Sequence, residues 1–110
     1  MNIHKNLTLD KWSLYSKGQQ ILMIANEINR AKNFLKKNDF EIAKNSYERA
    51  LDLIDITIQD DKWKNNLKEI LRCKEFIGFL YYEKNYTLNT LLLNNLILLN
   101  SESYNLLNKK

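Results

Sequence analysis

The chain has 110 residues, of which 45% are hydrophobic and 27% are charged. This length suits a single hydrophobic core, and the composition excludes an intrinsically disordered chain. There is no proline and there are only two glycines, and because hairpin turns depend on these residues, the shortage indicates an all-α fold. We expect one helical domain over 1–110, with a frayed segment at 1–10 and a short tail at 101–110.

The first predicted helix begins at Lys11 or Ser13 and ends at Lys36. Apolar residues recur along it at steps of three and four, which places their side chains on one buried face. These residues are Ile21, Ile24, Ile28, Ala31 and Leu35. Asp10 or Ser13 is the expected N-cap, and Asn38 is suited to the left-handed conformation that follows a helix end.

The second predicted helix follows an Asp39 N-cap and runs from Phe40 to about Ile58. Its inward positions have the same spacing. They are Phe40, Ala43, Tyr47, Ala50, Ile54 and Thr57. The two alanines allow a neighbouring helix to approach closely. Short connections between long helices favour antiparallel neighbours, so the predicted architecture is a small up-down-up-down bundle of about four helices.

The third predicted helix is capped by Asp60 or Asp61 and ends near Glu83. Its predicted inner line is Trp63, Leu67, Ile70, Lys74, Ile77 and Tyr81. Lys74 is unusual on such a line, because a buried ammonium group costs free energy unless it reaches water or a carboxylate. The favoured interpretation is a side chain whose stem covers apolar surface while its head reaches solvent. The alternative is a residue that sets helix register or forms an ion pair.

The fourth predicted helix runs from about Tyr86 to Asn100 and is apolar around most of its circumference. Its apolar run, 88–99, is too short to cross a bilayer, so we expect no membrane contact. One side, including Leu88 and Leu91, is expected to face the bundle. The other side then predicts an interface with a second copy or another protein. The predicted interface residues are Leu92, Leu93, Leu96 and Ile97.

Residues 31–53, AKNFLKKNDFEIAKNSYERALDL, carry alternating small and aromatic positions. These positions are Ala31, Phe34, Phe40, Ala43, Tyr47 and Ala50. The pattern resembles a single tetratricopeptide-repeat (TPR) hairpin, and the three-helix MIT trafficking modules look similar over the same stretch. The resemblance implies two antiparallel helices with a tight crossing and covers about a fifth of the chain.

No residue pattern predicts a catalytic centre, a cofactor site or a metal site. His4 is the only histidine and Cys73 the only cysteine, which leaves no pair for a transition-metal site and no internal disulfide. Cys73 is expected to be a small buried residue of a cytoplasmic protein. Asp55 is expected on the surface as an ion-pair partner of Lys44, Arg49 or Lys62.

The sequence therefore favours a non-catalytic protein-interaction or assembly module that self-associates through its C-terminal helix. The formal net charge is +4, from lysines scattered along the chain. An RNA- or DNA-associated bundle that places these lysines on phosphate is the alternative. An enzyme ranks third, because no nucleophile, base and orienting group can be named.

Overall fold

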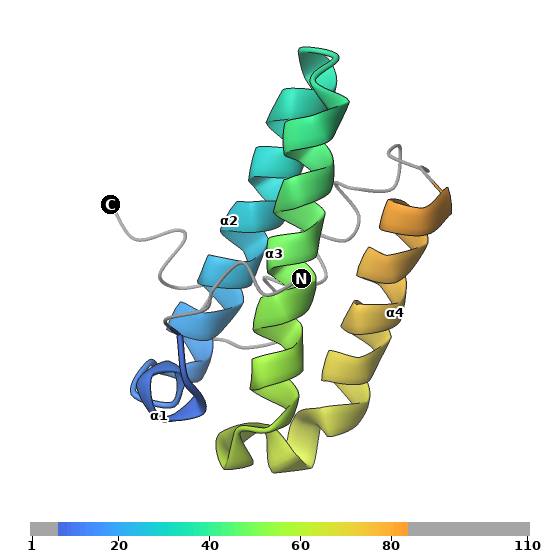
Figure 1. The fold of residues 1–110 in the computed structure, drawn as a ribbon. Coiled ribbons are helices and arrows are strands. Elements are labelled where there is room, and N and C mark those ends of the chain that lie inside the picture. The colour runs from blue at the N-terminus through green and yellow to red at the C-terminus, as the bar shows by residue number, and fades with distance from the viewer. Residues whose placement is uncertain (1–6, 84–110) are drawn as a thin grey trace.

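The computed structural model describes residues 7–83, and this part of the chain is helical with no strand (Figure 1). The elements in chain order are α1 (Leu9–Trp12), α2 (Lys17–Lys36), α3 (Phe40–Ile58), a 3-10 helix η1 (Asp61–Asn66) and α4 (Leu67–Glu83). The prediction of a small all-α bundle is confirmed. The fourth predicted helix, 86–100, and the tail at 101–110 lie outside the described residues.

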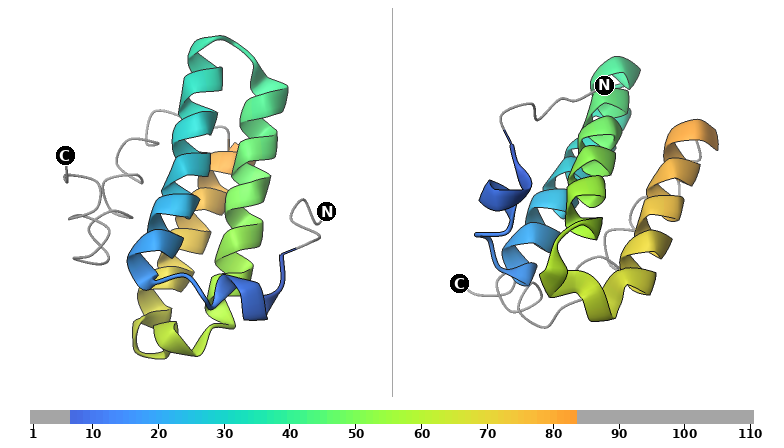
Figure 2. Two further views of the ribbon diagram at one scale, coloured as in Figure 1. Left: turned by 90° about the vertical axis from the view of Figure 1, so that its left-hand side faces the viewer. Right: turned by 60° about the horizontal axis from the view of Figure 1, so that its bottom comes forward.

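Helices α2 and α3 form an antiparallel hairpin, and α4 lies against one face of it (Figure 2). The turn of the hairpin follows the predicted chemistry. Asn38 adopts a left-handed conformation with φ 59°, and Asp39 caps α3 by accepting a hydrogen bond from the Ile42 backbone N–H at 3.3 Å. An asparagine tolerates this conformation better than most residues, so the chain reverses here without a glycine.

The single helix predicted from Lys11 or Ser13 to Lys36 is wrong at its N-terminal end. The chain forms the short α1, leaves helical geometry, and starts α2 at Lys17. The N-cap of α2 is Ser16, whose hydroxyl accepts from the Gln19 backbone N–H while the Gln19 side chain accepts from the Ser16 N–H. This reciprocal capping box satisfies two unpaired donors and fixes the start of α2 at Lys17, five residues beyond Trp12.

The inner line predicted for the third helix is also partly wrong. Of the two predicted N-caps, Asp60 and Asp61, the structure has Asp60. It caps η1, whose six residues precede α4. A 3-10 helix turns faster per residue than an α-helix, so Trp63 and the α4 positions do not share one α-helical line. The buried residues of α4 are Ile70, Cys73, Ile77 and Leu80. Leu67, Lys74 and Tyr81 lie at its edge.

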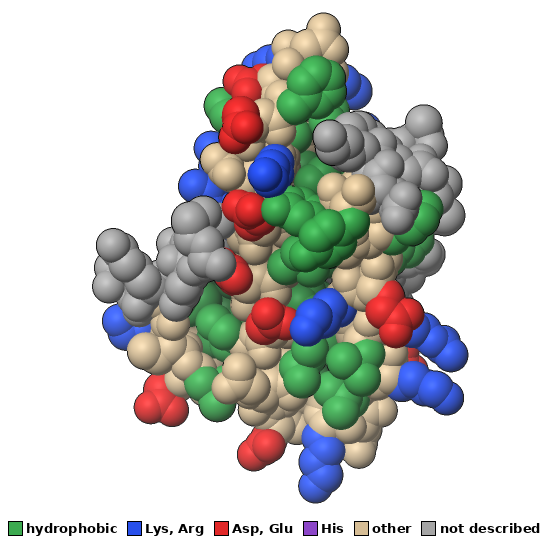
Figure 3. Space-filling model, turned by 45° about the vertical axis from the view of Figure 1, so that its right-hand side comes forward, with side chains coloured by type: hydrophobic (Ala, Val, Ile, Leu, Met, Phe, Trp, Pro, Cys, Tyr) green, Lys and Arg blue, Asp and Glu red, His purple; other side chains and the backbone are tan. Residues whose placement is uncertain are grey.

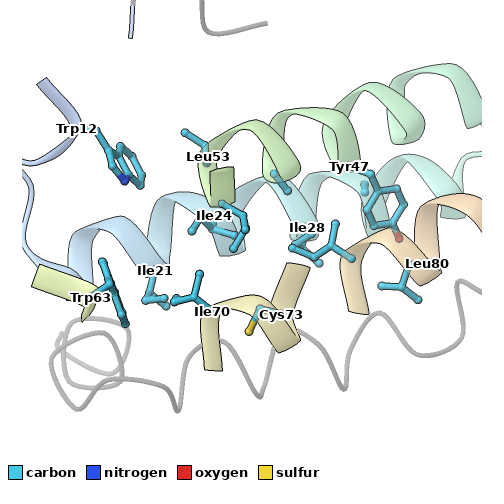
Figure 4. Close-up of a cluster of buried hydrophobic side chains, with 14 of the residues drawn as sticks. Trp12, Ile21, Ile24, Ile28, Tyr47, Leu53, Trp63, Ile70, Cys73 and Leu80 are labelled. Carbon is cyan, nitrogen blue, oxygen red and sulfur yellow. The ribbon is translucent and has the colours of Figure 1, made fainter. Parts of the chain in front are cut away.

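The core joins the inward faces of α2, α3 and α4 and is closed at one end by Trp12 and Trp63 (Figure 4). Every predicted inward residue of α2 is buried except Leu35, which is partly exposed. On α3 only Phe40 departs from the prediction: it is 56% exposed. Phe40 is the first residue of α3, at the tip of the hairpin. Full burial of one isoleucine stabilises a fold by about 1.5–3 kcal/mol, so these rows hold the helices together.

Candidate interaction surface

A buried polar cluster lies at the end of the bundle where α1, α2 and η1 meet. The Gln20 amide Nε2 donates to the Trp12 carbonyl oxygen and to Asp60 Oδ2, both at 2.9 Å. Its Oε1 accepts from the Trp63 indole N–H at 2.6 Å. Gln20 is fully buried, and three of its four hydrogen-bonding positions are filled. We call Trp12, Gln20, Asp60, Lys62 and Trp63 the Gln20 cluster.

The charges of the Gln20 cluster are paired. Lys62 Nζ lies 2.8 Å from Asp60 Oδ2 and donates to the Ser13 carbonyl oxygen at 2.9 Å. Burial alone would raise the pKa of Asp60, but hydrogen bonds from Lys62 and Gln20 outweigh it and hold that pKa below 3.8. The cluster therefore fastens α1 and η1 to α2. Because its polar groups are hydrogen-bonded to one another, the cluster stabilises the fold.

The edges of α3 and α4 meet along a line that two side-chain contacts define. Asp55 Oδ1 lies 2.9 Å from Lys74 Nζ, and the Tyr81 hydroxyl donates to Glu48 Oε2 at 2.8 Å. The second contact raises the pKa of Tyr81 to about 12, because the hydrogen bond and the carboxylate charge both disfavour the phenolate. Lys74 forms an ion pair at this edge, and the partner of Asp55 is none of the three cations that the sequence suggested.

The two contacts also fix the register of the helices. Seven residues separate Lys74 from Tyr81, and seven separate Asp55 from Glu48 in the opposite direction, as antiparallel helices require. Intermediate positions on each edge follow at steps of three and four. They are Glu48, Leu51, Asp55 and Ile58 on α3, and Leu67, Leu71, Lys74, Gly78 and Tyr81 on α4. We call these nine residues the α3/α4 seam.

The α3/α4 seam is accessible and largely apolar. Leu67 is 37% and Leu71 41% exposed, whereas Leu51, Ile58 and Tyr81 are partly buried against the core. The side chains of the ion pair are about half exposed, at 52% for Asp55 and 46% for Lys74. Figure 3 shows apolar side chains gathered along this face of the molecule, with acidic and basic groups between them.

Three residues of the seam are predicted from the sequence, but for a different position in the fold. Leu67, Lys74 and Tyr81 were assigned to the inner line of the third helix, and they belong to the seam. A lysine in register with apolar residues was the available signal, since a half-exposed helix edge accepts both kinds of side chain. The predicted interface residues Leu92, Leu93, Leu96 and Ile97 lie outside the described residues.

The remaining candidate groups within residues 7–83 do not form a reactive or metal-binding site. Burial raises the pKa of the Cys73 thiol to about 11, with a further contribution from the Glu69 charge, so this cysteine is a weak nucleophile near neutral pH. Within residues 7–83 no three His, Cys, Asp or Glu side chains gather as a metal site would require. No α-helix in this range has the length and apolar character needed to cross a membrane.

Comparison with protein-family models, curated proteins and solved structures gave no significant match.

Proposed function

We propose that this chain is a non-catalytic helical interaction or assembly module that self-associates. The observation that carries the proposal is the apolar surface of α4, where Leu71, Phe79 and Tyr82 are 41%, 43% and 76% exposed. Single apolar residues are normal on protein surfaces, but several large ones exposed along one helix are typical of an interface. Aromatic side chains are enriched in such interfaces, because they bury large areas at low entropic cost.

Charge supports this proposal over nucleic-acid binding. Residues 7–83 contain thirteen Lys and Arg and twelve Asp and Glu, so most of the net charge of +4 comes from residues outside that range. A phosphate-binding face needs a concentrated positive patch. On the seam the one lysine is paired with a carboxylate. Within residues 7–83 no observation favours RNA or DNA as the partner.

The α2–α3 hairpin is consistent with the resemblance to TPR and MIT modules. Ala31, Ala43 and Ala50 are all buried where the two helices pack. Assignment to either family stays a prediction, because close helix packing is shared by many helical hairpins. A reducing, cytoplasmic location is proposed on the same footing, from a single buried cysteine that has no disulfide partner in the sequence.

Light scattering coupled to size exclusion tests the proposal directly. We expect the mass of the wild-type chain to rise above the 13.2 kDa of one copy as its concentration increases from low to high micromolar. A mass that stays at one copy throughout that range contradicts self-association.

A further inference from the structure

We propose that the α3/α4 seam pairs with the seam of a second copy of this chain, with α3 of each copy lying over α4 of the other. This inference rests on the proposed function and identifies the surface and the partner. Its basis is the arrangement of charge along the seam: the carboxylates, Glu48 and Asp55, are on α3, and the ammonium group, Lys74, is on α4.

An interface between two identical copies must be self-complementary, since the same patch contributes both sides. A two-fold axis that runs parallel to the helices, above the seam, places α3 of the second copy over α4. Asp55 of the second copy then faces Lys74, and the reciprocal contact forms at the same height. A two-fold axis across the helices at the height of the ion pair would place α3 over α3, with Asp55 against Asp55 and Lys74 against Lys74, which like-charge repulsion disfavours.

The apolar positions match under the same operation. The register fixed by the two side-chain contacts places Leu51 level with Gly78 and Ile58 level with Leu71. A second copy would therefore set its Leu51 above Gly78 and its Ile58 above Leu71. The two apolar levels lie on either side of the charged one, so each copy offers apolar, charged and apolar surface in the same order.

Gly78 provides space where the pairing needs it. No atom lies within 4 Å of the position that a Cβ on Gly78 would occupy. Glycine is among the least favourable residues inside a helix, so its position on an exposed edge is not explained by packing within the described chain. The missing side chain leaves open space at this position of α4, which a leucine from the second copy can occupy.

A charge-exchange experiment tests the pairing. Asp55→Lys leaves two lysines on each seam, and Lys74→Glu adds one carboxylate to the two already there. Each variant alone repels its own copy, and we expect its self-association to weaken at least tenfold in sedimentation or light scattering. In an equimolar mixture both reciprocal contacts become attractive again, so we expect association between the two variants to recover.

Controls separate pairing from folding. Both variants lose the ion pair within one chain, so circular dichroism and the thermal midpoint report any damage to the bundle in each. Lys36→Glu on α2 and Asp10→Lys on α1 reverse exposed charges outside the seam and should leave association unchanged. Gly78→Leu provides a second variant with open space around the substituted side chain; we expect a folded protein whose self-association is weakened.

Two results would overturn the inference. One is association of Asp55→Lys, Lys74→Glu and Gly78→Leu equal to that of the wild type. The other is a mixture as monomeric as its components, since the pair would then act only within one chain. If the wild type associates and only changes at Leu93 and Ile97 disrupt it, the proposed function stands and the seam pairing fails. A strictly monomeric wild type contradicts both.

Discussion

At the scale of single residues, Gln20 has an unusual position for a neutral polar side chain. It is fully buried, and it connects the Trp12 carbonyl, the Trp63 indole and the Asp60 carboxylate. A buried amide is costly unless its groups are paired, so the cluster depends on all its members being present together. None of this is visible in the periodicity of α2, where position 20 falls next to the apolar row and carries no apolar residue.

Gln20→Leu should lower the free energy of unfolding by about 1–3 kcal/mol, because it leaves the Trp63 indole N–H buried without an acceptor. Urea unfolding followed by circular dichroism measures the change. Asn33→Leu makes the same kind of replacement at an exposed position of α2 and should stay within about 0.5 kcal/mol of the wild type. Equal stabilities for the two variants would show that the Gln20 hydrogen bonds contribute little.

The paired charge of Asp60 predicts how stability depends on pH. Its pKa is lowered in the folded chain from an ordinary value of 3.8, so its stabilising contribution is complete above that value and is lost as the pH falls through the folded pKa. Asp60→Asn should be less stable than the wild type near neutral pH, and the difference should shrink on acidification. Urea unfolding from about pH 6 to about pH 2 follows both proteins. Asp10→Asn, at an exposed site, is the control; a difference that stays constant with pH would be inconsistent with this assignment.

At the scale of helices, the sequence predicts α2 and α3 well and α4 less well. The inward rows of α2 and α3 follow a continuous α-helical period, so spacing alone identifies Ile21, Ile24, Ile28 and the alanines of α3. The period is interrupted twice elsewhere, by the capping box at Ser16 and by η1. Both interruptions depend on local hydrogen bonds, which hydrophobic spacing does not record. Because the sequence does not predict η1, three seam residues, Leu67, Lys74 and Tyr81, are wrongly predicted to lie on the inner line.

Ala50 tests the closeness of the α2–α3 packing. It is fully buried, so Ala50→Leu should overpack the hairpin and lower the free energy of unfolding by about 1–3 kcal/mol. Chemical denaturation with urea measures the loss. Wild-type stability in this variant would mean that the space around Ala50 is not filled by neighbouring side chains.

At the scale of the whole molecule, the sequence predicts that the chain has an interaction surface, but it does not predict the α3/α4 seam. An unusually apolar C-terminal segment predicted an interface at Leu92, Leu93, Leu96 and Ile97, and that prediction stays open. The α3/α4 seam could not be found from one sequence, because it depends on which edges of two helices meet. Only the contacts from Lys74 to Asp55 and from Tyr81 to Glu48 reveal that pairing.

Changing Leu93 and Ile97 together to lysine tests the C-terminal interface. Several exposed leucines would sacrifice a substantial part of the stability of a domain, so a partner is expected to cover them. We expect the double variant to remain helical by circular dichroism while light scattering shows a shift toward the mass of one copy. A folded double variant with an unchanged mass would exclude these two residues from the interface.

The Gln20 cluster also determines what the tryptophan fluorescence of this protein reports. Both of its tryptophans, Trp12 and Trp63, are buried at the same end of the bundle, within hydrogen-bonding reach of one glutamine. Tryptophan fluorescence therefore reports on that end alone, whereas far-ultraviolet ellipticity averages over all the helices. If α1 and η1 detach before the α2–α3 hairpin melts, the emission shifts to longer wavelength at a lower denaturant concentration than the ellipticity decays. A single coincident transition means instead that the cluster and the helices unfold as one cooperative unit.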